Sequence, residues 1–198
     1  RKDVDDHPAG GGDGMVIRAD ITEQAILSIK QEDSFIIHVT PSGKVFDHKL
    51  ARSLSEKKHI IFLCGRYAGF DCRVTEQYAN AHLSLGDFVL SGGELPALSM
   101  IDSIARFIPG VLGNEVSALF DSFENGLLES PTYTKPNIFN GNKIPDILLS
   151  GNHEKIKSFH RVEQIKITAK YRPDLIIKCW ESFTQSEKTI IEKTLFEN

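Results

Sequence analysis

The clearest structural signal in the chain is the stretch Ser84-Leu85-Gly86-Asp87-Phe88-Val89-Leu90-Ser91-Gly92-Gly93-Glu94-Leu95-Pro96-Ala97. Its apolar run Phe88-Val89-Leu90 predicts a buried strand, and the paired glycines that follow predict a tight turn. Pro96 suits the first turn of a helix, because that turn needs no hydrogen bond from its own N–H groups. Beyond it, an apolar stripe predicts a long helix: Leu98, Ile101, Ile104, Ala105 and Ile108. The stretch is therefore typical of a strand, a turn and a helix in succession.

Two more continuous apolar runs predict buried strands, Phe35-Ile36-Ile37-His38-Val39 and Ile60-Ile61-Phe62-Leu63-Cys64. Runs this continuous are typical of a sheet that is covered on both faces. Helical patterns lie at residues 21–30 and 49–54, and Asp20 with Glu23 has the spacing of a capping box. Strands that alternate with helices predict an α/β fold with a mainly parallel sheet.

The chain changes character between residues 130 and 145. This stretch holds three prolines and has little periodicity, so it predicts a linker or an extended crossing segment. Helical patterns follow at residues 154–169 and 174–183, and Thr184 with Glu187 predicts a capping box before a last helix. The tail is therefore expected to be a small helical domain. A further short helix is expected just before Asp121.

The composition is that of a soluble globular protein, with 198 residues of which 40% are hydrophobic and 25% are charged. No stretch approaches the ~18 continuous apolar residues of a membrane span. The three separated cysteines, Cys64, Cys72 and Cys179, form no metal or disulfide motif and favour a reducing cytosol. The chain begins with Arg1 and has no signal peptide, so we expect a cytoplasmic protein whose sequence starts inside a longer one.

The net charge of −4 hides an uneven distribution. Residues 150–198 hold nine Lys and Arg against seven Asp and Glu, so this tail is net +2 and residues 1–149 are net −6. The excess is sharpest between His153 and Arg172, where six basic residues stand against two acidic ones. Such a segment suits a phosphate backbone, but a solvated helix face has the same composition, and charge alone does not separate the two.

Short polar loops follow all three predicted strands. They are Thr40-Pro41-Ser42-Gly43, Gly65-Arg66-Tyr67-Ala68-Gly69 and Ser91-Gly92-Gly93-Glu94. Each is either a plain strand-to-helix turn or, because such loops gather at one edge of a parallel sheet, part of a pocket for a nucleoside-like cofactor. The P-loop pattern is missing, and the glycine-rich residues 10–15 depart from the dinucleotide fingerprint at its last glycine. The histidines show no metal-ligand spacing, and His38 and His59 are expected to be satisfied core or edge residues of strands.

Arg106 and Asp121 are polar residues that invite chemistry. Arg106 ends the apolar helix, and Asp121-Ser122-Phe123 is expected to lie in a loop. An Arg near a loop Asp is either a surface ion pair or a carboxylate base beside a guanidinium that stabilises developing negative charge. The pattern alone leaves both interpretations open.

Together these motifs resemble the bacterial tRNA (guanine-N1)-methyltransferase family, TrmD, of the SPOUT class. The resemblance begins at Val4-Asp5-Asp6 and the glycines at 10–12, and it continues through the three loops. It then includes Arg106-Phe107-Ile108-Pro109-Gly110-Val111-Leu112-Gly113, Asp121-Ser122-Phe123 and Leu149-Ser150-Gly151-Asn152-His153. It covers essentially the whole chain, and residues 84–97 are its most specific part.

The resemblance implies a mainly parallel sheet with the deep trefoil knot of the SPOUT class, flanked by helices, and a small all-helical C-terminal domain. It implies a knotted catalytic domain that binds S-adenosyl-L-methionine at residues 1–129, a linker at 130–146 and a helical tRNA-binding domain at 147–198. The implied activity is methyl transfer from S-adenosyl-L-methionine to N1 of guanosine at tRNA position 37, next to the anticodon. The family forms a homodimer with its active sites at the subunit interface, and Mg²⁺ is a second cofactor candidate for which no metal site is visible.

The family motifs also assign roles to individual residues. Asp121 is the expected base and Arg106 its partner, from opposite sides of the dimer interface. The expected cofactor contacts are Thr40, Pro41, Ser42, Gly65, Tyr67, Ser84, Leu85, Gly86, Phe88, Leu90, Gly92 and Gly93. The expected tRNA contacts are Ser122, His153, Lys155, Lys157, Arg161, Lys166 and Lys170.

Two alternatives stand beside this expectation. One is a SPOUT-class RNA methyltransferase that modifies the ribose 2′-hydroxyl, and the other is a tRNA-binding homologue with impaired catalysis. The second is prompted by departures from the family pattern. Ala68 stands where the family commonly has Glu, Ala9 and Asp13 replace its Tyr and Pro, and the family's opening strand and helix are expected to be missing.

Overall fold

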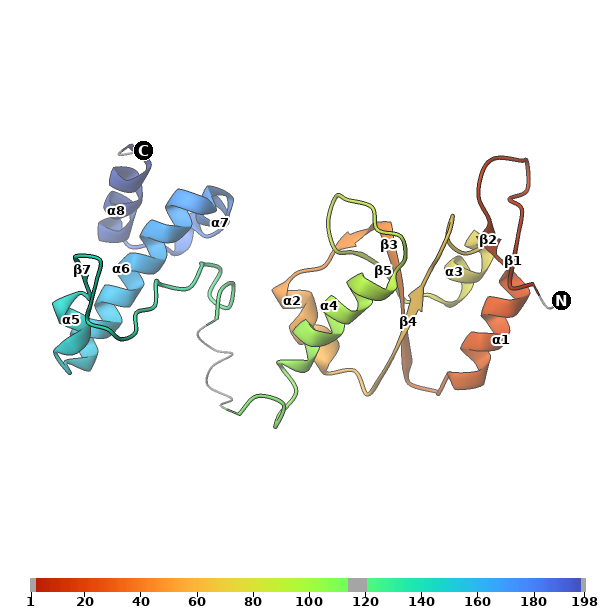
Figure 1. Ribbon diagram of the computed structural model, residues 1–198, viewed down its shortest axis with the longest axis horizontal. Coiled ribbons are helices and arrows are strands. Elements are labelled where there is room, and N and C mark those ends of the chain that lie inside the picture. The colour runs from red at the N-terminus through yellow and green to blue at the C-terminus, as the bar shows by residue number, and fades with distance from the viewer. Residues whose placement is uncertain (1–2, 114–120, 197–198) are drawn as a thin grey trace. The chain divides into compact units, whose positions relative to one another are not determined.

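The computed structural model describes residues 3–113 and 121–196, and the chain divides into two compact units, Arg1–Gly113 and Asn114–Asn198 (Figure 1). The helix expected just before Asp121 falls on residues 114–120 and lies outside the described residues. The functional division expected at residues 129 and 146 stays a prediction.

Over residues 3–113, the first unit is built on a parallel sheet with the strand order β4-β3-β5. An antiparallel pair, β1 and β2, precedes it. The elements are β1 (Asp5–Asp6), β2 (Val16–Ile17), α1 (Ala19–Ile29), β3 (Ser34–Val45), α2 (His48–Ser55), β4 (His59–Cys64), α3 (Cys72–Tyr78), β5 (Ala81–Ser84) and α4 (Glu94–Ala105). The predicted α/β class with a parallel sheet is confirmed.

The central strand β3 sends alternate side chains into two cores, one on each face of the sheet. Ile37 lies in a core that α2 and α4 close and that also buries Met100. Ile36 lies on the opposite face, where α1 and α3 contribute Ile26 and Val74. Figure 1 shows the two helix pairs on opposite sides of the sheet. Both faces are therefore covered, as the continuous apolar runs predicted.

The third strand is not the one that the sequence predicted. β5 pairs with β3 over residues 81–84, and Leu83 is buried there. Phe88, Val89 and Leu90 instead lie in the loop after it and are 53%, 83% and 41% exposed. The prediction was wrong because β5 is short and only partly buried, so its apolar signal is weaker than that of the loop.

The polar loop at residues 40–43 is a bulge within β3 rather than the end of a strand. Val39 and Lys44 both pair with Leu83, so the residues between them are looped out of the ladder. Gly43 is required at the base of this bulge, because a Cβ there would collide with the backbone nitrogen of Leu83. β3 thus continues past a polar loop that stays available to line a pocket.

Helix α4 buries only part of the apolar stripe that predicted it, namely Ile104, and completes its buried face with residues outside that stripe. Ala97, Met100 and Ile104 are buried, whereas Leu98 and Ile101 are exposed. The helix has apolar residues on both faces, so the spacing of the stripe could not show which of them packs on the sheet.

The capping box predicted from Asp20 and Glu23 is wrong. Arg18 precedes α1 without a side-chain cap, and its guanidinium binds the Asp20 carboxylate, with Nη2 2.7 Å from Oδ2. Glu23 accepts a hydrogen bond from the hydroxyl of Tyr78 on α3 at 2.5 Å. The two carboxylates therefore pair with the side chains of Arg18 and Tyr78, and α1 begins without a side-chain cap from its N-cap residue.

The described part of the second unit, residues 121–196, is mostly helical. Its elements are β6 (Ile138–Phe139), β7 (Asn142–Lys143), α5 (Asp146–Leu149), α6 (His153–Tyr171), α7 (Pro173–Lys178), the 3₁₀ helix η2 (Trp180–Ser182) and α8 (Gln185–Phe196). The core consists of Leu127, Ile165, Ala169, Ile176, Phe183 and Ile191. α6 confirms the helix predicted at 154–169, whereas the helix predicted at 174–183 ends at Lys178 and gives way to η2.

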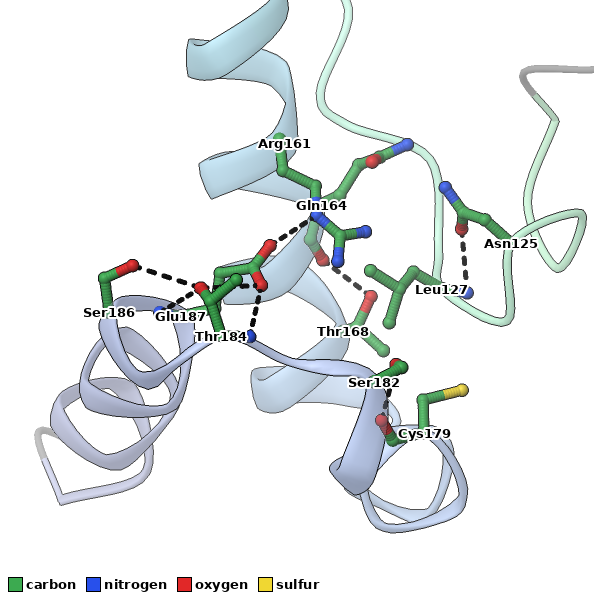
Figure 2. A network of polar contacts seen from close by, with 10 residues as sticks. All are labelled: Asn125, Leu127, Arg161, Gln164, Thr168, Cys179, Ser182, Thr184, Ser186 and Glu187. Carbon is green, nitrogen blue, oxygen red and sulfur yellow. Dashed lines mark hydrogen bonds and ion pairs between the residues drawn. The ribbon is translucent and has the colours of Figure 1, made fainter.

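The capping box of Thr184 and Glu187 is confirmed. The Glu187 N–H donates to Thr184 Oγ1 at 3.3 Å, and the Thr184 N–H donates to Glu187 Oε2 at 2.8 Å (Figure 2). Glu187 also binds Arg161 of α6, with Nε 2.7 Å from Oε1. Burial opposes the charge on Glu187, but these hydrogen bonds outweigh it and hold the pKa of Glu187 below its ordinary value. A single carboxylate therefore starts α8 and ties it to α6.

Within the described ranges, no helix combines the length and the apolar character needed to cross a bilayer. Cys64, Cys72 and Cys179 carry free thiols.

We expect Thr184→Ala to lower the free energy of unfolding by about 1 kcal/mol, because the first N–H groups of α8 lose an acceptor. Denaturant unfolding followed by circular dichroism measures this loss. Thr189→Ala is the control, since the Thr189 hydroxyl donates only to Gln185 O within α8, at 3.1 Å, and Ala favours a helix interior. Equal destabilisation by the two substitutions would contradict the capping role.

Candidate functional site

Three loops of the first unit line one pocket of about 330 Å³. The bulge in β3 contributes Thr40 and Pro41, and the loop after β4 contributes Gly65 and Tyr67. The loop between β5 and α4 supplies most of the remaining wall. These segments meet here because they belong to neighbouring parallel strands: the first interrupts β3, and the other two follow β4 and β5.

The loops after β4 and before α4 touch through their backbones. The Gly93 N–H donates to Gly65 O at 2.9 Å, and a Cβ on Gly93 would lie only 2.8 Å from Cα of Cys64. Only glycine permits this approach. Arg66 Nε lies 2.8 Å from Glu94 Oε1, and the hydrogen bond holds the pKa of Glu94 below its ordinary value. The two loops are therefore joined by a backbone hydrogen bond and by an ion pair.

The pocket wall combines apolar side chains with exposed backbone. Its apolar side chains include Leu85, Phe88, Leu90 and Pro96, and its glycines are Gly65, Gly69, Gly86, Gly92 and Gly93. The buried Ser84 hydroxyl accepts from the Gly86 N–H at 3.2 Å and donates to Gly86 O at 3.1 Å, which shapes the start of the third loop. This lining suits a ligand with a flat apolar ring and polar edges.

His38 and His82 form a pair of imidazoles on neighbouring strands, and His38 lines the pocket. Their Nδ1 atoms are 3.1 Å apart, and the ring of Phe70 lies against His38 with centroids 5.7 Å apart. Burial lowers the pKa of His38 to about 4, and repulsion from His82 adds to the shift. His38 is therefore neutral near pH 7. His38 was predicted to be a strand residue with a hydrogen-bond partner, and its contact with His82 confirms this. The prediction did not place His38 in the pocket.

The structure brings together all the predicted cofactor residues except Ser42 as pocket lining. These are Thr40, Pro41, Gly65, Tyr67, Ser84, Leu85, Gly86, Phe88, Leu90, Gly92 and Gly93. Ser42 lies in the same bulge, with its hydroxyl 3.0 Å from that of Thr40. Sequence reasoning did not select His38, Phe70 or Val89, which also line the pocket. His38 precedes the first polar loop closely in the sequence, and this position could have indicated that it lines the pocket. No comparable sequence feature singled out Phe70 or Val89 as pocket residues.

Arg106 and Asp121 belong to different units. Arg106 is exposed directly after α4, and its backbone N–H donates to Asp102 O at 3.3 Å. Asp121 is half-buried, and its carbonyl oxygen accepts from the Glu124 N–H at 3.4 Å. Their chemical roles stay predictions.

The predicted tRNA contacts all belong to the second unit, and some of them already have protein partners. Arg161 binds Glu187, and Lys166 Nζ lies 2.8 Å from Glu163 Oε1. Ser122 Oγ accepts a hydrogen bond from the Glu129 N–H at 2.9 Å. The exposed members of the set are His153, Lys155, Lys157, Lys166 and Lys170 on α6.

The glycine-rich stretch before β2 packs against the second pocket loop. The Ala68 N–H donates to Met15 O at 2.9 Å, and the Ile17 N–H donates to Gly69 O at 2.9 Å. Ala68 itself lines the pocket. Among residues 3–113 and 121–196, no three His, Cys, Asp or Glu side chains gather as a metal ion would require, so nothing described supports the Mg²⁺ candidate.

Comparison with known proteins identifies the family. The family model described as tRNA (Guanine-1)-methyltransferase TrmD matches residues 1–178. The chain belongs to this family. The resemblance that the motifs carried is thereby confirmed.

Three relatives named tRNA (guanine-N(1)-)-methyltransferase illustrate how closely this TrmD family member matches. A protein of Dictyoglomus turgidum is 47% identical over 190 residues, which are 96% of this chain and 76% of that protein. A protein of Bacillus pumilus is 46% identical over 190 residues, and the match covers 94% of this chain and 78% of that protein. A protein of Geobacter sulfurreducens is 48% identical over 177 residues, which are 88% of this chain and 72% of that protein.

We expect acidification from pH 6.5 to about pH 4 to destabilise this TrmD family member in part through His38. The unfolded chain binds a proton on this imidazole near pH 6.5 and the folded protein only near pH 4, so protons favour the unfolded state within that window. His38→Gln should therefore lose less of its free energy of unfolding over this window than the unmodified protein.

Denaturant unfolding at a series of pH values measures this difference. His7→Gln, which removes an exposed imidazole, is the control. Parallel pH curves for His38→Gln and the unmodified protein would show that His38 makes no such contribution.

Proposed function

We propose that this chain transfers the methyl group of S-adenosyl-L-methionine to N1 of guanosine at tRNA position 37, next to the anticodon. The observation that carries the proposal is the single pocket that three glycine-containing loops form in a chain of the TrmD family. Relatives that match 96% and 94% of the chain are named tRNA (guanine-N(1)-)-methyltransferase, which supports the same reaction and substrate class.

The pocket residues fit the cofactor. Leu85, Phe88 and Leu90 offer apolar surface for the adenine ring, and the glycine backbone offers hydrogen-bonding groups for its polar edges. The residues that would hold it are Thr40, Pro41, Ser42, Gly65, Tyr67, Ser84, Leu85, Gly86, Phe88, Leu90, Gly92 and Gly93. S-adenosyl-L-methionine supplies an activated methyl group on a positively charged sulfur. Neutral His38 adds no positive charge to the wall, which favours a cationic ligand.

The proposed architecture is the SPOUT trefoil knot. Support comes from the pocket loops, because the loop before α4 lies directly on the end of β4 and is bonded there through Gly93 and Gly65. Knots are otherwise almost absent from proteins, so this part of the proposal rests on family membership.

Asp121 and Arg106 would carry out the proton chemistry. Guanine N1 holds a proton at neutral pH and is a poor nucleophile until that proton leaves. Asp121 would accept the proton as a general base. Negative charge then develops on O6, where the Arg106 guanidinium would stabilise it by about 3 kcal/mol, as oxyanion donors do.

The proposed enzyme is a homodimer in which Arg106 and Asp121 reach each active site from opposite sides of the interface. Leu95, Leu98 and Ile101 recur every three residues on α4, and all are exposed. An exposed apolar stripe of this kind marks a surface that another protein covers. A second copy of the chain would bury the stripe and complete the site.

The tRNA would bind the helical domain proposed at residues 147–198, beyond a linker at 130–146, in the cytoplasm. His153, Lys155, Lys157 and Lys170 are exposed on α6, and the three lysines can neutralise phosphates. The target base must leave its stack to reach the methyl group, which requires a firm hold on the surrounding stem.

Asp121→Asn should lower kcat about 10²- to 10⁴-fold, because the amide cannot accept the N1 proton. Transfer of labelled methyl groups to unmodified tRNA measures kcat, and a calorimetric titration with S-adenosyl-homocysteine should show unchanged cofactor binding. Glu181→Gln removes an exposed carboxylate elsewhere in the same unit and is the control. Full activity in Asp121→Asn would refute its assignment as the base.

The same assay separates the alternative functions. tRNA with adenosine at position 37 should accept no methyl group, and hydrolysed product should carry the methyl group on guanine. A methyl group on ribose would favour 2′-hydroxyl modification instead. A titration without saturable cofactor binding would favour a tRNA-binding protein with impaired catalysis.

Leu98→Glu should convert the dimer to a monomer and abolish most activity, because it places a charge in the proposed apolar interface. Sedimentation velocity gives the mass, and the methyl-transfer assay gives the activity of the same sample. Leu27→Glu alters a similarly exposed leucine on α1 and should leave both values unchanged. An active monomer would contradict the shared active site.

A further inference from the structure

The loop that carries Asp121 is packed into the helical core of the second unit. Leu127 is 1% exposed and lies in the core beside Ile165 of α6. Gly126 precedes it with φ of +81°, and a Cβ at that position would lie 2.6 Å from Cys179 Sγ. The loop is therefore held on the helices by a buried side chain and by a turn that favours glycine.

Thr168 joins α6 to this loop through a buried hydroxyl. The side chain is 0% exposed, and its Oγ1 accepts a hydrogen bond from the Leu128 N–H at 2.9 Å. The same hydroxyl donates to Gln164 O, one turn earlier on α6, at 2.6 Å (Figure 2). The hydroxyl of Thr168 therefore donates its proton to a carbonyl of α6 and accepts a hydrogen bond from the loop.

Two more hydrogen bonds extend this attachment toward Asp121. The Glu129 N–H, next along the chain from Leu128, donates to Ser122 Oγ at 2.9 Å. The Phe123 N–H donates to Leu127 O at 2.7 Å and closes the loop on itself. Because Ser122 follows Asp121 directly, the bonds fix the loop immediately beside the carboxylate.

We propose that Thr168 is a positioning residue for methyl transfer, fixing the loop of Asp121 on the helix that faces the tRNA. The inference rests on the proposed function, in which Asp121 is the base and the exposed cations of α6 contact tRNA. Thr168 itself is buried in the unit and acts through Leu128, Glu129 and Ser122. α6 therefore both binds the substrate and determines where the base lies.

Substitution by valine tests the hydroxyl with little change of side-chain shape. The N–H of the half-buried Leu128 loses its acceptor, which is the fully buried Thr168 hydroxyl, so we expect the loop to shift until the N–H regains a partner. Thr168→Ser restores both the acceptor and the donor. A small misplacement of a catalytic group lowers kcat without changing how tightly the substrate is held elsewhere.

The experiment compares Thr168→Val, Thr168→Ser and the control Thr189→Val in the full chain, with the folded fraction of each measured by circular dichroism. Thr189 bonds its own helix as Thr168 does, but it is exposed on α8. Thr168→Val should lose kcat by about 10- to 100-fold, as expected for a displaced base, while KM for tRNA stays unchanged. Thr168→Ser should recover most of the activity, and Thr189→Val should match the unmodified protein.

Ser122→Ala provides a second test. It removes the acceptor of the Glu129 N–H at the other end of the attachment, and Ser122 is not part of the helical core. It should also lower kcat, and this kcat result stands even if Thr168→Val does not fold. KM for tRNA is decisive only for Thr168→Val, because Ser122 is itself an expected tRNA contact. Unchanged kcat in the folded variants, a rise in KM alone, or no recovery with Thr168→Ser would overturn the proposal. Failure of the proposed function is distinct, since the unmodified protein itself would then transfer no methyl group to tRNA.

Discussion

The close contact of Gly93 with the end of β4 is the constraint on which the pocket depends. The Gly93 N–H reaches Gly65 O at 2.9 Å, and no side chain larger than hydrogen fits above Cys64 without displacing backbone. This contact holds the loop before α4 over the loop after β4, and the ion pair of Arg66 and Glu94 adds to it. The pocket is therefore a consequence of backbone packing, and its lining is rich in glycine for that reason.

Which apolar runs are covered by helices explains which strands the sequence predicted correctly and which it did not. Continuous apolar runs predicted β3 and β4 because both strands are covered by helices on two faces. Phe88, Val89 and Leu90 gave the same signal, although they are exposed in a loop held in place by Gly93. Periodicity reports how apolar a segment is, but it does not report whether helices, a ligand or another chain will cover it.

The candidate site was predictable where the family motifs coincide with the pocket, and less so where it depends on packing. The three loops could be chosen from their small residues, whereas the pairing of His38 with His82 requires the register of β3 against β5. In the second unit, Thr184 and Glu187 lie within one short stretch, so their capping box was visible in the sequence. The bond from Leu128 to Thr168 joins residues far apart in the chain, and no local pattern indicates it.

With the proposed cofactor pocket and the proposed base in separate units, the proposed reaction would depend on the tRNA. The pocket lies wholly in the first unit, while the Asp121 loop is anchored on α6 in the second. A tRNA stem bound to the cations of α6 would therefore bind the unit that carries the proposed base, so that contacts remote from the reacting atoms would favour the reactive arrangement. That coupling requires a rigid attachment between helix and loop. The hydroxyl of Thr168 is buried between Gln164 O and the Leu128 N–H, and the proposed role in that attachment would account for a polar side chain at the centre of an apolar core.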